Sequence, residues 1–584
     1  MRRVLAFVIV AWTSSLALRV SAGGLEYVGA GTQALGRGGA VTARADDPMV
    51  LGYNPAGLAE LRGNQILVNA NLALMDACVD PIGYYGWGAY GGGQASRLTG
   101  FGKTLDLNIG DTNPGGPKDA YYTGRLDTVC MRQNITPVPQ LGFSFRLTER
   151  LGVGFGLIFP SQAPQGQWGG PNGVIDTPAG LRPAPTRYML LNTGSIGLFP
   201  TIGLGFRFTK WLRLGAAFEW GMYGVDLTNM TAAAGGGTSP ANDIVSRTRV
   251  TDWFVPAVNA SIHLVPFDAL DIVAAVRVSG DLEAPGTLEI TSGLFDSRFV
   301  PRTSEERATL YWKLPWKLRG GIRYASRLVP RPDGTGAGEG SLEFGPRVGD
   351  AMENERWDIE LDVEYQLNAR ASTQRVVGEP NQFVIFETPG GMISPTPFPS
   401  APRIGASTDI VLPKNWKNQI SARLGGTYNV LPGRLAFSLG AHYENRGVDP
   451  SYMQIDFWPV SRIGLHAGVK IRVAKRIDFV ASYAHIFQET ITVSAPGTDA
   501  DTGQNIWNRW NMTGQVDAID KHVGTAPRGM TGQFIDAPVA SADGVAAFPQ
   551  ILTKGVAGAP PSIVNAGTYR SSIDVVSLGV NVHY

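Results

Sequence analysis

Apolar and polar side chains alternate with a period of two along most of the chain from Gln65 onward, which is the pattern of β-strands with two chemically different faces. In residues 462–473, aliphatic side chains at every second position from Ile463 to Val473 alternate with Gly, His, Lys and Arg. The last residues, 576–584, alternate in the same way and end on Tyr584. Several such segments are longer than the roughly five or six residues of a typical soluble strand.

Acidic and basic side chains occupy matching faces of two consecutive segments. Residues 357–367 carry four carboxylates on one face, and the preceding segment carries its cations on one face. If the two segments are antiparallel neighbours, opposite charges face each other, at about 0.2–1 kcal/mol per pair. We expect a charge network of Lys317, Arg319, Arg323, Asp358, Glu360, Asp362 and Glu364, with Lys313 on the same face and Trp312, Leu314, Trp316, Leu318 and Ile322 on the other.

A continuous apolar face combined with a polar or glycine-rich face is the arrangement of a transmembrane β-barrel with a polar interior. Hydrocarbon cannot hydrogen-bond the backbone, so such a sheet must close on itself. About fourteen strands can be counted, an even number as in single-chain outer-membrane barrels. The predicted fold is therefore all-β, an antiparallel transmembrane barrel, with strands at 65–74, 137–147, 150–160, 187–209, 211–228, 248–265, 268–291, 305–326, 354–371, 412–431, 433–448, 456–474, 475–493 and 568–584.

The predicted connections alternate in length. Long ones such as 77–136 and 494–567 follow odd-numbered strands, and tight ones such as 148–149, 209–210 and 431–433 follow even-numbered strands. Long extracellular loops and short periplasmic turns produce this rhythm. The connection 326–353 breaks it, because it is long on the predicted periplasmic side, and the sequence offers no reason for it.

Tryptophans lie near the predicted strand ends. Side chains of this kind form girdles at the two membrane interfaces, although tryptophans in an ordinary core would give the same spacing. The residues concerned are Trp211, Trp220, Trp253, Trp312, Trp416 and Trp458. Two more, Trp507 and Trp510, stand in the long last loop, either as a hydrophobic capture patch or packed against a neighbouring loop.

Composition and the N-terminus indicate an exported protein. Only 17% of the 584 residues are charged and the net charge is +1, which argues against nucleic-acid binding. Residues 1–22 read as a signal peptide, with Arg2 and Arg3, an apolar run, and small residues at the cleavage site. Beyond it no apolar run reaches the length of about 18 residues needed for a membrane-spanning helix. Cys78 and Cys130 can form a disulfide in an oxidising compartment, or remain as two free thiols.

The segment before the first strand carries the most specific motif. It reads GAGTQALGRGGAVTARADDPMVLGYNPAGLAEL from Gly29 to Leu61, with Asn54, Pro55 and Ala56 within it. Together with the strand count and the aromatic C-terminal residue, it resembles the FadL-type outer-membrane transporters of long-chain fatty acids and other hydrophobic compounds, which include importers of aromatic hydrocarbons. The resemblance implies that residues 23–63 fold into the lumen of a barrel formed by residues 64–584.

In that family this segment is a hatch and the Asn-Pro-Ala motif is part of a gate, so the resemblance places Asn54, Pro55 and Ala56 there. Gly36 and Gly38 would allow turns and close approach to the wall. The family also has a kinked third strand that opens a side portal to the bilayer. Here Gly152, Gly154, Gly156 and Pro160 could supply that deformable strand, or the glycines could only make room for the hatch.

The resemblance implies passive uptake: capture of a hydrophobic compound in a lumenal pocket, movement of the hatch, and lateral release into the bilayer. The expected partners are fatty acids or hydrocarbons and outer-membrane lipids, for a monomeric protein of the outer membrane of a Gram-negative bacterium. We expect no cofactor and no nucleic-acid partner. We also expect no metal, since the Cys and His residues lack the spacing of metal ligands. A carboxylate head group would need a Lys or Arg, which the sequence does not single out.

Three other functions remain open at this point. An enzyme built into a barrel wall would need a serine nucleophile and a histidine base. The chain has six histidines but no Gly-x-Ser-x-Gly motif around a serine, so we expect no enzyme. A general porin would have an open lumen and no hatch. An adhesin or assembly factor would place its function in loops such as 494–567.

Overall fold

The computed structural model describes most of the predicted barrel and hatch. The residues described are 31–81, 127–132, 135–158, 166–170, 173–177, 180–187, 189–232, 243–292, 302–328, 350–378, 382–384, 403–405, 409–493 and 567–584. The expected signal peptide, Pro160, Trp507 and Trp510 lie outside them.

The chain forms a closed 14-strand antiparallel β-barrel, as the alternation predicts. Closure occurs where β1 (Gln65–Pro81) pairs with β26 (Gly567–His583) along its whole length. Besides these two, the uninterrupted spans are β10 (Leu212–Ala232), β11 (Asp243–Phe267), β22 (Leu435–Glu444) and β23 (Arg462–Ala474).

The other spans are each divided into two segments. They are β2 (Val129–Cys130) with β3 (Ile135–Arg146), β4 (Leu151–Ile158) with β5 (Gly166–Gln167), β8 (Asn192–Thr193) with β9 (Ile196–Arg207), β12 (Leu270–Ser279) with β13 (Asp281–Ser292), β14 (Arg302–Lys313) with β15 (Lys317–Arg327), β16 (Glu355–Gln366) with β17 (Thr373–Gly378), β20 (Asp409–Pro413) with β21 (Gln419–Leu431), and β24 (Ile477–Gln488) with β25 (Ile491–Val493). Two small pairs stand apart, β6 (Val174–Thr177) with β7 (Gly180–Pro183), and β18 (Gln382–Val384) with β19 (Arg403–Gly405).

Helical segments are short. They are α2 (Thr32–Gly36), η1 (Pro48–Gly52), η2 (Pro55–Ala59), α4 (Ala351–Asn354), η5 (Asn368–Ala371) and η6 (Pro450–Tyr452). Within the described part of the chain, no helix has the length and apolar character needed to cross a membrane.

The two faces of the strands follow the alternation. On β16 the side chains of Ile359 and Leu361 are exposed on the outside, whereas those of Asp358, Glu360 and Asp362 are buried inside. The same outward exposure of large apolar side chains recurs around the barrel, for example at Val68, Leu72, Ile202, Leu204, Phe218, Val258, Leu465 and Leu578. The inward face of β16 is therefore polar, and the exterior of the barrel is apolar.

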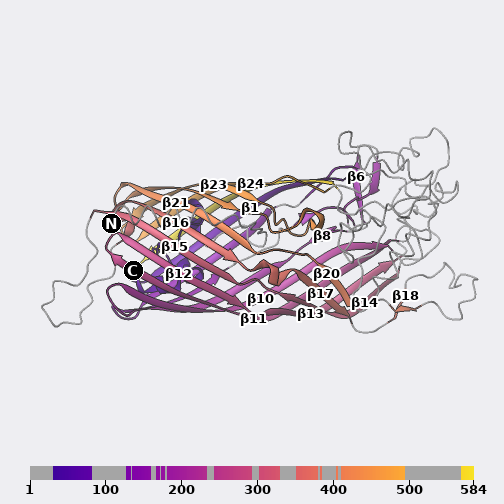
Figure 1. Cartoon of the computed structure of the whole chain (residues 1–584), viewed down its shortest axis with the longest axis horizontal. Helices are drawn as coiled ribbons and strands as arrows, with labels where there is room; N and C mark the ends of the chain where they lie inside the picture. Colours follow the sequence, from indigo (N-terminus) through magenta and orange to yellow (C-terminus); the bar gives the residue numbers. More distant parts are fainter. Residues whose placement is uncertain are drawn as a thin grey trace, which may run out of the picture.

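The tight turns lie at the end of the barrel that holds the C-terminus, on the left in Figure 1. They are residues 147–150, 208–211, 268–269, 432–434 and 475–476. The unexplained connection between β15 and β16 is also at this end, and its described part is anchored. Gly433 N donates to Met352 O of α4 at 2.8 Å, and Asn429 Nδ2 donates to Ala351 O at 3.0 Å.

One predicted face assignment is wrong. Trp312 and Leu314 were expected outside and Lys313 inside, but Trp312 and Leu314 are buried in the interior and Lys313 is exposed. The reason is a break between β14 and β15 at residues 314–316, which changes the inward positions from even to odd numbers. The prediction failed because it continued the alternation of residues 317–323 back to Trp312, across this break in the strand.

The prediction that tryptophans form girdles at the outer surface is correct for three of the six residues. Trp211, Trp220 and Trp253 are exposed on the outer surface. Trp312, Trp416 and Trp458 are instead buried inside the barrel. Trp458 belongs to residues 445–461, a segment called the strap below. Both ends of the strap were predicted to be parts of strands. The strap instead folds inward between β22 and β23, where its apolar side chains are buried.

Candidate functional site

Residues 31–63, called the hatch below, lie inside the barrel, in indigo near the end that holds the C-terminus in Figure 1. Its second half packs through apolar side chains against strands β4 and β9. A Cβ on Gly154 would lie 2.7 Å from Leu58 Cδ2, and a Cβ on Gly203 would lie 2.6 Å from Leu51 Cδ1. Glycines of the wall therefore give the hatch its space.

The first half of the hatch touches the wall backbone to backbone. A Cβ on Gly440 of β22 would lie 2.1 Å from the Arg37 carbonyl carbon. Gly38 has φ 68°, and a Cβ there would lie 2.8 Å from Ala441 N. A Cβ on Gly36 would lie 2.6 Å from Ser482 Oγ. Only glycine fits such contacts, which gives Gly36 and Gly38 a physical role.

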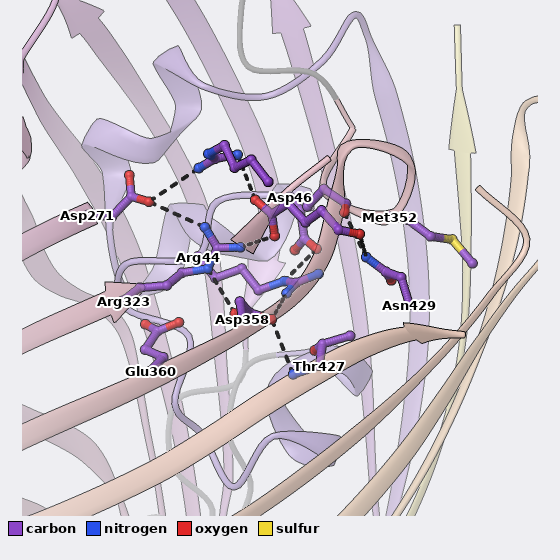
Figure 2. Close-up of polar contacts among 12 residues, drawn as sticks. Arg44, Asp46, Asp271, Arg323, Met352, Asp358, Glu360, Thr427 and Asn429 are labelled. Atoms are coloured by element: carbon purple, nitrogen blue, oxygen red, sulfur yellow. Dashed lines mark hydrogen bonds and ion pairs between the residues drawn. The ribbon is translucent and has the colours of Figure 1, made fainter. Parts of the chain in front are cut away.

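Arg37 and Arg44 clamp this half to the carboxylates of β16. Figure 2 shows Arg44 beside Asp358. Arg37 donates to both oxygens of Asp358, at 3.0 and 2.8 Å, and to Glu360 at 3.2 Å. Arg44 donates to Asp358 at 2.6 Å and to Asp46 at 2.8 Å. Bidentate pairs of this kind combine strength with a defined orientation.

Hatch backbone groups complete the clamp. Val41 N and Thr42 N both donate to Asp362 Oδ2, at 3.0 and 2.9 Å, and Ala43 N donates to Glu360 Oε1 at 2.6 Å. The carboxylates of β16 thus take the place of a neighbouring strand for the irregular hatch backbone, which must satisfy its donors inside the barrel.

The expected wall pairing is present, but it is only part of the network. β15 and β16 are antiparallel neighbours, with Arg319 opposite Glu364 and Arg323 opposite Glu360. Arg319 contacts Glu364, whereas Arg323 donates to Asp358 at 2.9 Å. Lys317 lies further along the lumen. The sequence prediction missed Arg37 and Arg44, because it matched the four carboxylates with four cations and counted Lys313 among them. Lys313 is exposed on the outer face, and the two hatch arginines supply further positive charge instead.

A second clamp holds the end of the hatch. Glu60 accepts from Arg213 at 2.6 Å and from Arg207 at 3.2 Å, and all three side chains are buried. These arginines project inward from β10 and β9. The hatch is therefore fixed at both ends to different parts of the wall.

The Asn-Pro-Ala motif lies between the clamps, against β11. Asn54 is fully buried, and its Nδ2 donates to Thr42 O at 2.9 Å. Ala56 N donates to Ser261 Oγ at 2.8 Å, and Pro55 begins η2, where its missing N–H costs nothing.

On the far side of the hatch from the tight turns, the lumen contains a mainly apolar pocket. It encloses about 780 Å³, including space open to solvent. Its walls carry aliphatic and aromatic groups, with Arg277, Lys317 and Asp456 among the few charged ones. The apolar lining residues are Ile196, Tyr223, Val225, Leu227, Leu310, Trp312, Leu314, Pro315 and Phe457. Arg277 donates to both oxygens of Glu219.

On the near side of the hatch lies a polar chamber of about 570 Å³, again including space open to solvent. Its lining is dominated by ionisable groups from hatch and wall: Arg44, Asp46, Glu60, Arg62, His263, Asp271, Arg323, Asp350, Glu355, Lys470 and His583. The hatch thus separates two spaces of opposite character.

The strap covers the apolar pocket from the loop end. Phe457 packs against Trp312 and Trp416, with ring centroids 5.5 and 5.2 Å apart. Next to it, Asp456 contacts the buried ammonium group of Lys414. These contacts attach the strap to the wall directly beside the pocket.

Two further predicted sites have a definite placement. Cys78 and Cys130 form a disulfide on the neighbouring strands β1 and β2. Gly152, Gly154 and Gly156 face inward on β4, which pairs with β3 and β9 without a register shift over these residues. The described part of β4 is therefore regular, and Gly154 and Gly156 border Leu58 and Leu51 of the hatch.

One hatch carboxyl is electrostatically unusual. Burial, together with the neighbouring Asp46 carboxylate, raises the pKa of Asp47 to about 7. Asp47 also caps η1, where it accepts from Met49 N at 2.8 Å. Among the described residues, no group of three or more His, Cys, Asp or Glu side chains is placed to hold a metal ion.

No protein-family model and no curated protein sequence matches the chain. Solved structures do match it. A Pseudomonas aeruginosa FadL homologue aligns with a TM-score of 0.60 at 12% identity, over 96% of this chain and 100% of its own. The chain has the FadL-type fold. The P. putida toluene transporter TodX aligns with a TM-score of 0.51 at 12% identity, over 96% and 99% of the two chains. The CymD monoaromatic hydrocarbon channel gives 0.50 at 12%, over 95% and 98%.

Proposed function

We propose that this protein is a channel for passive uptake of hydrophobic compounds across the outer membrane of a Gram-negative bacterium. The observation that carries the proposal is the division of the lumen by the hatch into an apolar pocket and a charged chamber. The solved structures with the same fold are described as a FadL homologue, a toluene transporter and a monoaromatic hydrocarbon channel, which agrees with this function.

The outer surface supports insertion into a membrane. Large apolar side chains are exposed around the barrel, and exposed Trp220 and Trp253 suit an interface. Polar side chains of the strands face the interior. The strands therefore present apolar side chains to the hydrocarbon of the bilayer and polar side chains to the hatch. A closed barrel needs no partner chain for this, which supports a monomer.

The pocket attracts solutes by the hydrophobic effect, at about 0.8 kcal/mol for each CH₂ group removed from water. No energy source is required for such transfer. For an amphiphile, Lys317 and Arg277 are the cations that line the pocket, and they would face a carboxylate head group. For a hydrocarbon, the aromatic lining is sufficient.

Release is lateral in this proposal, because the route along the lumen past the hatch is unfavourable for an apolar solute. Beyond the hatch it would enter the chamber lined by Arg44, Arg323 and Asp271, where it would displace water from charged groups. The wall nearest to the hatch on this route is β4, whose inward glycines Gly154 and Gly156 border Leu58 and Leu51 of the hatch. We place the exit along β4, with a shift of the hatch around Asn54, Pro55 and Ala56 opening the route.

Uptake of labelled long-chain fatty acid, of labelled toluene and of a small sugar into vesicles carrying the protein tests the proposal. Both hydrophobic compounds should enter, and the sugar should not. Lys317→Ala should slow the fatty acid more than toluene, whereas Lys313→Ala, on the outer face, should change neither. Asn54→Ala should alter the rate for both compounds.

Two outcomes would contradict uptake of hydrophobic compounds. Equal entry of the sugar would indicate a general porin. Entry of none of the three would direct attention to the loops and to an adhesin or assembly role.

A further inference from the structure

His263 of β11 meets Asn54 of the hatch from the barrel wall. Its Nδ1 lies 3.4 Å from Asn54 Nδ2, and its Nε2 lies 2.9 Å from Asp271 Oδ1 of β12. His263, Asn54 and Asp271 are all buried. Asp271 in turn accepts from Arg323 at 3.3 Å, so the contact continues into the charge network that holds Arg37 and Arg44.

These neighbours determine where the proton of the imidazole lies. The Asp271 carboxylate can only accept, so His263 carries its proton on Nε2. Nδ1 is then an acceptor, and it faces the amide NH₂ of Asn54. That amide is oriented by Thr42 O, which accepts from Nδ2 at 2.9 Å, leaving the second hydrogen of Nδ2 for His263.

We propose that His263, braced by Asp271, is a positioning residue that holds Asn54 in the closed hatch, and that protonation of its Nδ1 releases this hold. A protonated Nδ1 would be a donor facing a donor. The Asn54 amide could present its oxygen instead, since Oδ1 has no partner among the described residues, but that rotation would break the bond to Thr42 O. Neither orientation keeps both contacts.

The charged groups around His263 are already matched. Arg213 on β10 pairs with Glu60 of the hatch at 2.6 Å, and Arg44 pairs with Asp46 at 2.8 Å. Asp271 is shared by Arg323 and Arg327 of β15. A proton added to His263 would therefore introduce an extra charge in a buried, balanced site. The groups that face it are Glu60, Arg44 and Asp46 from the hatch, Arg213, Asp271, Arg323 and Arg327.

Two substitutions separate positioning from general packing. An Asn side chain places its oxygen where His263 has Nδ1, and a Gln side chain places its amide where His263 has Nε2. His263→Asn should keep the contact with Asn54, whereas His263→Gln should keep the contact with Asp271 and lose Asn54. Loss of one buried hydrogen bond predicts about a five-fold increase in hatch opening.

Hydrogen exchange of hatch peptides, measured on the full-length folded barrel without cargo, reads this opening. At pH 7.5 the exchange of residues 32–61 should be about five-fold faster in His263→Gln than in the wild type, and within about two-fold of the wild type in His263→Asn. His485→Asn is the control, because His485 pairs with Asp574 at 2.8 Å on the outer face. The proposal fails if the Gln and Asn variants behave alike.

A pH series provides a second measurement that does not depend on the Gln variant folding. Over a series from pH 7.5 to 5.0, hatch exchange corrected for its intrinsic rate should rise in the wild type relative to His263→Asn. An identical profile in both proteins overturns the proposal. The role of His263 rests on the proposed hatch. If vesicles with the wild-type protein take up neither fatty acid nor toluene, the transport function is contradicted, and the hydrogen-exchange result still decides the role of His263.

Discussion

Arg37 of the hatch and Asp358 of β16 are joined by two parallel hydrogen bonds, from Nη1 to Oδ1 at 3.0 Å and from Nη2 to Oδ2 at 2.8 Å. Both side chains are almost completely buried. Asp358 also binds Arg44 of the hatch and Arg323 of the wall, so one carboxyl group joins the hatch to the barrel. The hatch can therefore move only if this group exchanges its partners.

Removal of Arg37 should loosen the hatch. Arg37→Gln leaves Asp358 and Glu360 with less positive charge in a buried site, and breaking a buried pair of this kind costs about 3–5 kcal/mol. Faster hydrogen exchange of residues 32–44 in the folded barrel is the expected result. The control is Arg62→Ala, because Arg62 is 58% exposed and its pair with Glu353 is worth about 0–1 kcal/mol. Equal exchange in the two variants would contradict the clamp.

A single methyl group should displace the hatch without disturbing the barrel. Gly440→Ala would place a Cβ 2.1 Å from the Arg37 carbonyl carbon, where backbone must move. Overpacking of this size costs about 1–3 kcal/mol. In Gly320→Ala the new Cβ would have only Val273 O nearby, at 3.9 Å. Vesicle uptake and hatch exchange should change in the first variant and not in the second, while both barrels keep their heat-modifiable shift on gels.

The stability of the hatch should depend on pH through Asp47. Because the pKa of Asp47 is raised to about 7 in the folded protein from an ordinary value of 3.8, its stabilising contribution is complete below about pH 4 and is lost as the pH rises through about 7. The midpoint of thermal unfolding should fall over that range. Asp47→Asn keeps an acceptor for Met49 N and should flatten the profile.

The exposed residue Asp281 offers the control for this series. Asp281→Asn should leave the pH profile of the wild type in place. A profile that keeps its slope in Asp47→Asn would assign the pH dependence to another group.

The strap should act as the closure of the pocket on the loop side. Asp456→Asn removes the charge that pairs with the buried Lys414, at a cost of about 3–5 kcal/mol, and should free Phe457 from Trp312 and Trp416. Ion conductance through the barrel in planar bilayers should increase. Asp449→Asn is a matched change within the strap, since its pair with Lys417 is half exposed and 3.8 Å long. Unchanged conductance in Asp456→Asn would show that the strap does not close the lumen.

Much of the barrel could be predicted because strand alternation is local. Each predicted strand range overlaps an observed span, and the pairing of Arg319 with Glu364 follows from the order of the strands. The position of the tight turns follows from the same count. The failures lie where a strand is interrupted. The break at residues 314–316 lets even-numbered residues such as Trp312 point inward before it and odd-numbered residues after it, and the strap takes Trp458 out of a strand.

The sequence by itself determined the two-sided strands and their closure, since every second side chain must suit one of two environments and unpaired backbone cannot face hydrocarbon. Only the tertiary structure decided which residues of the hatch meet which residues of the wall. Alternation shows that Asp358 and Glu360 point inward, but it cannot show that Arg37, more than three hundred residues away, lies opposite them. Contacts across a lumen join segments by their position in space, and no local pattern records that distance.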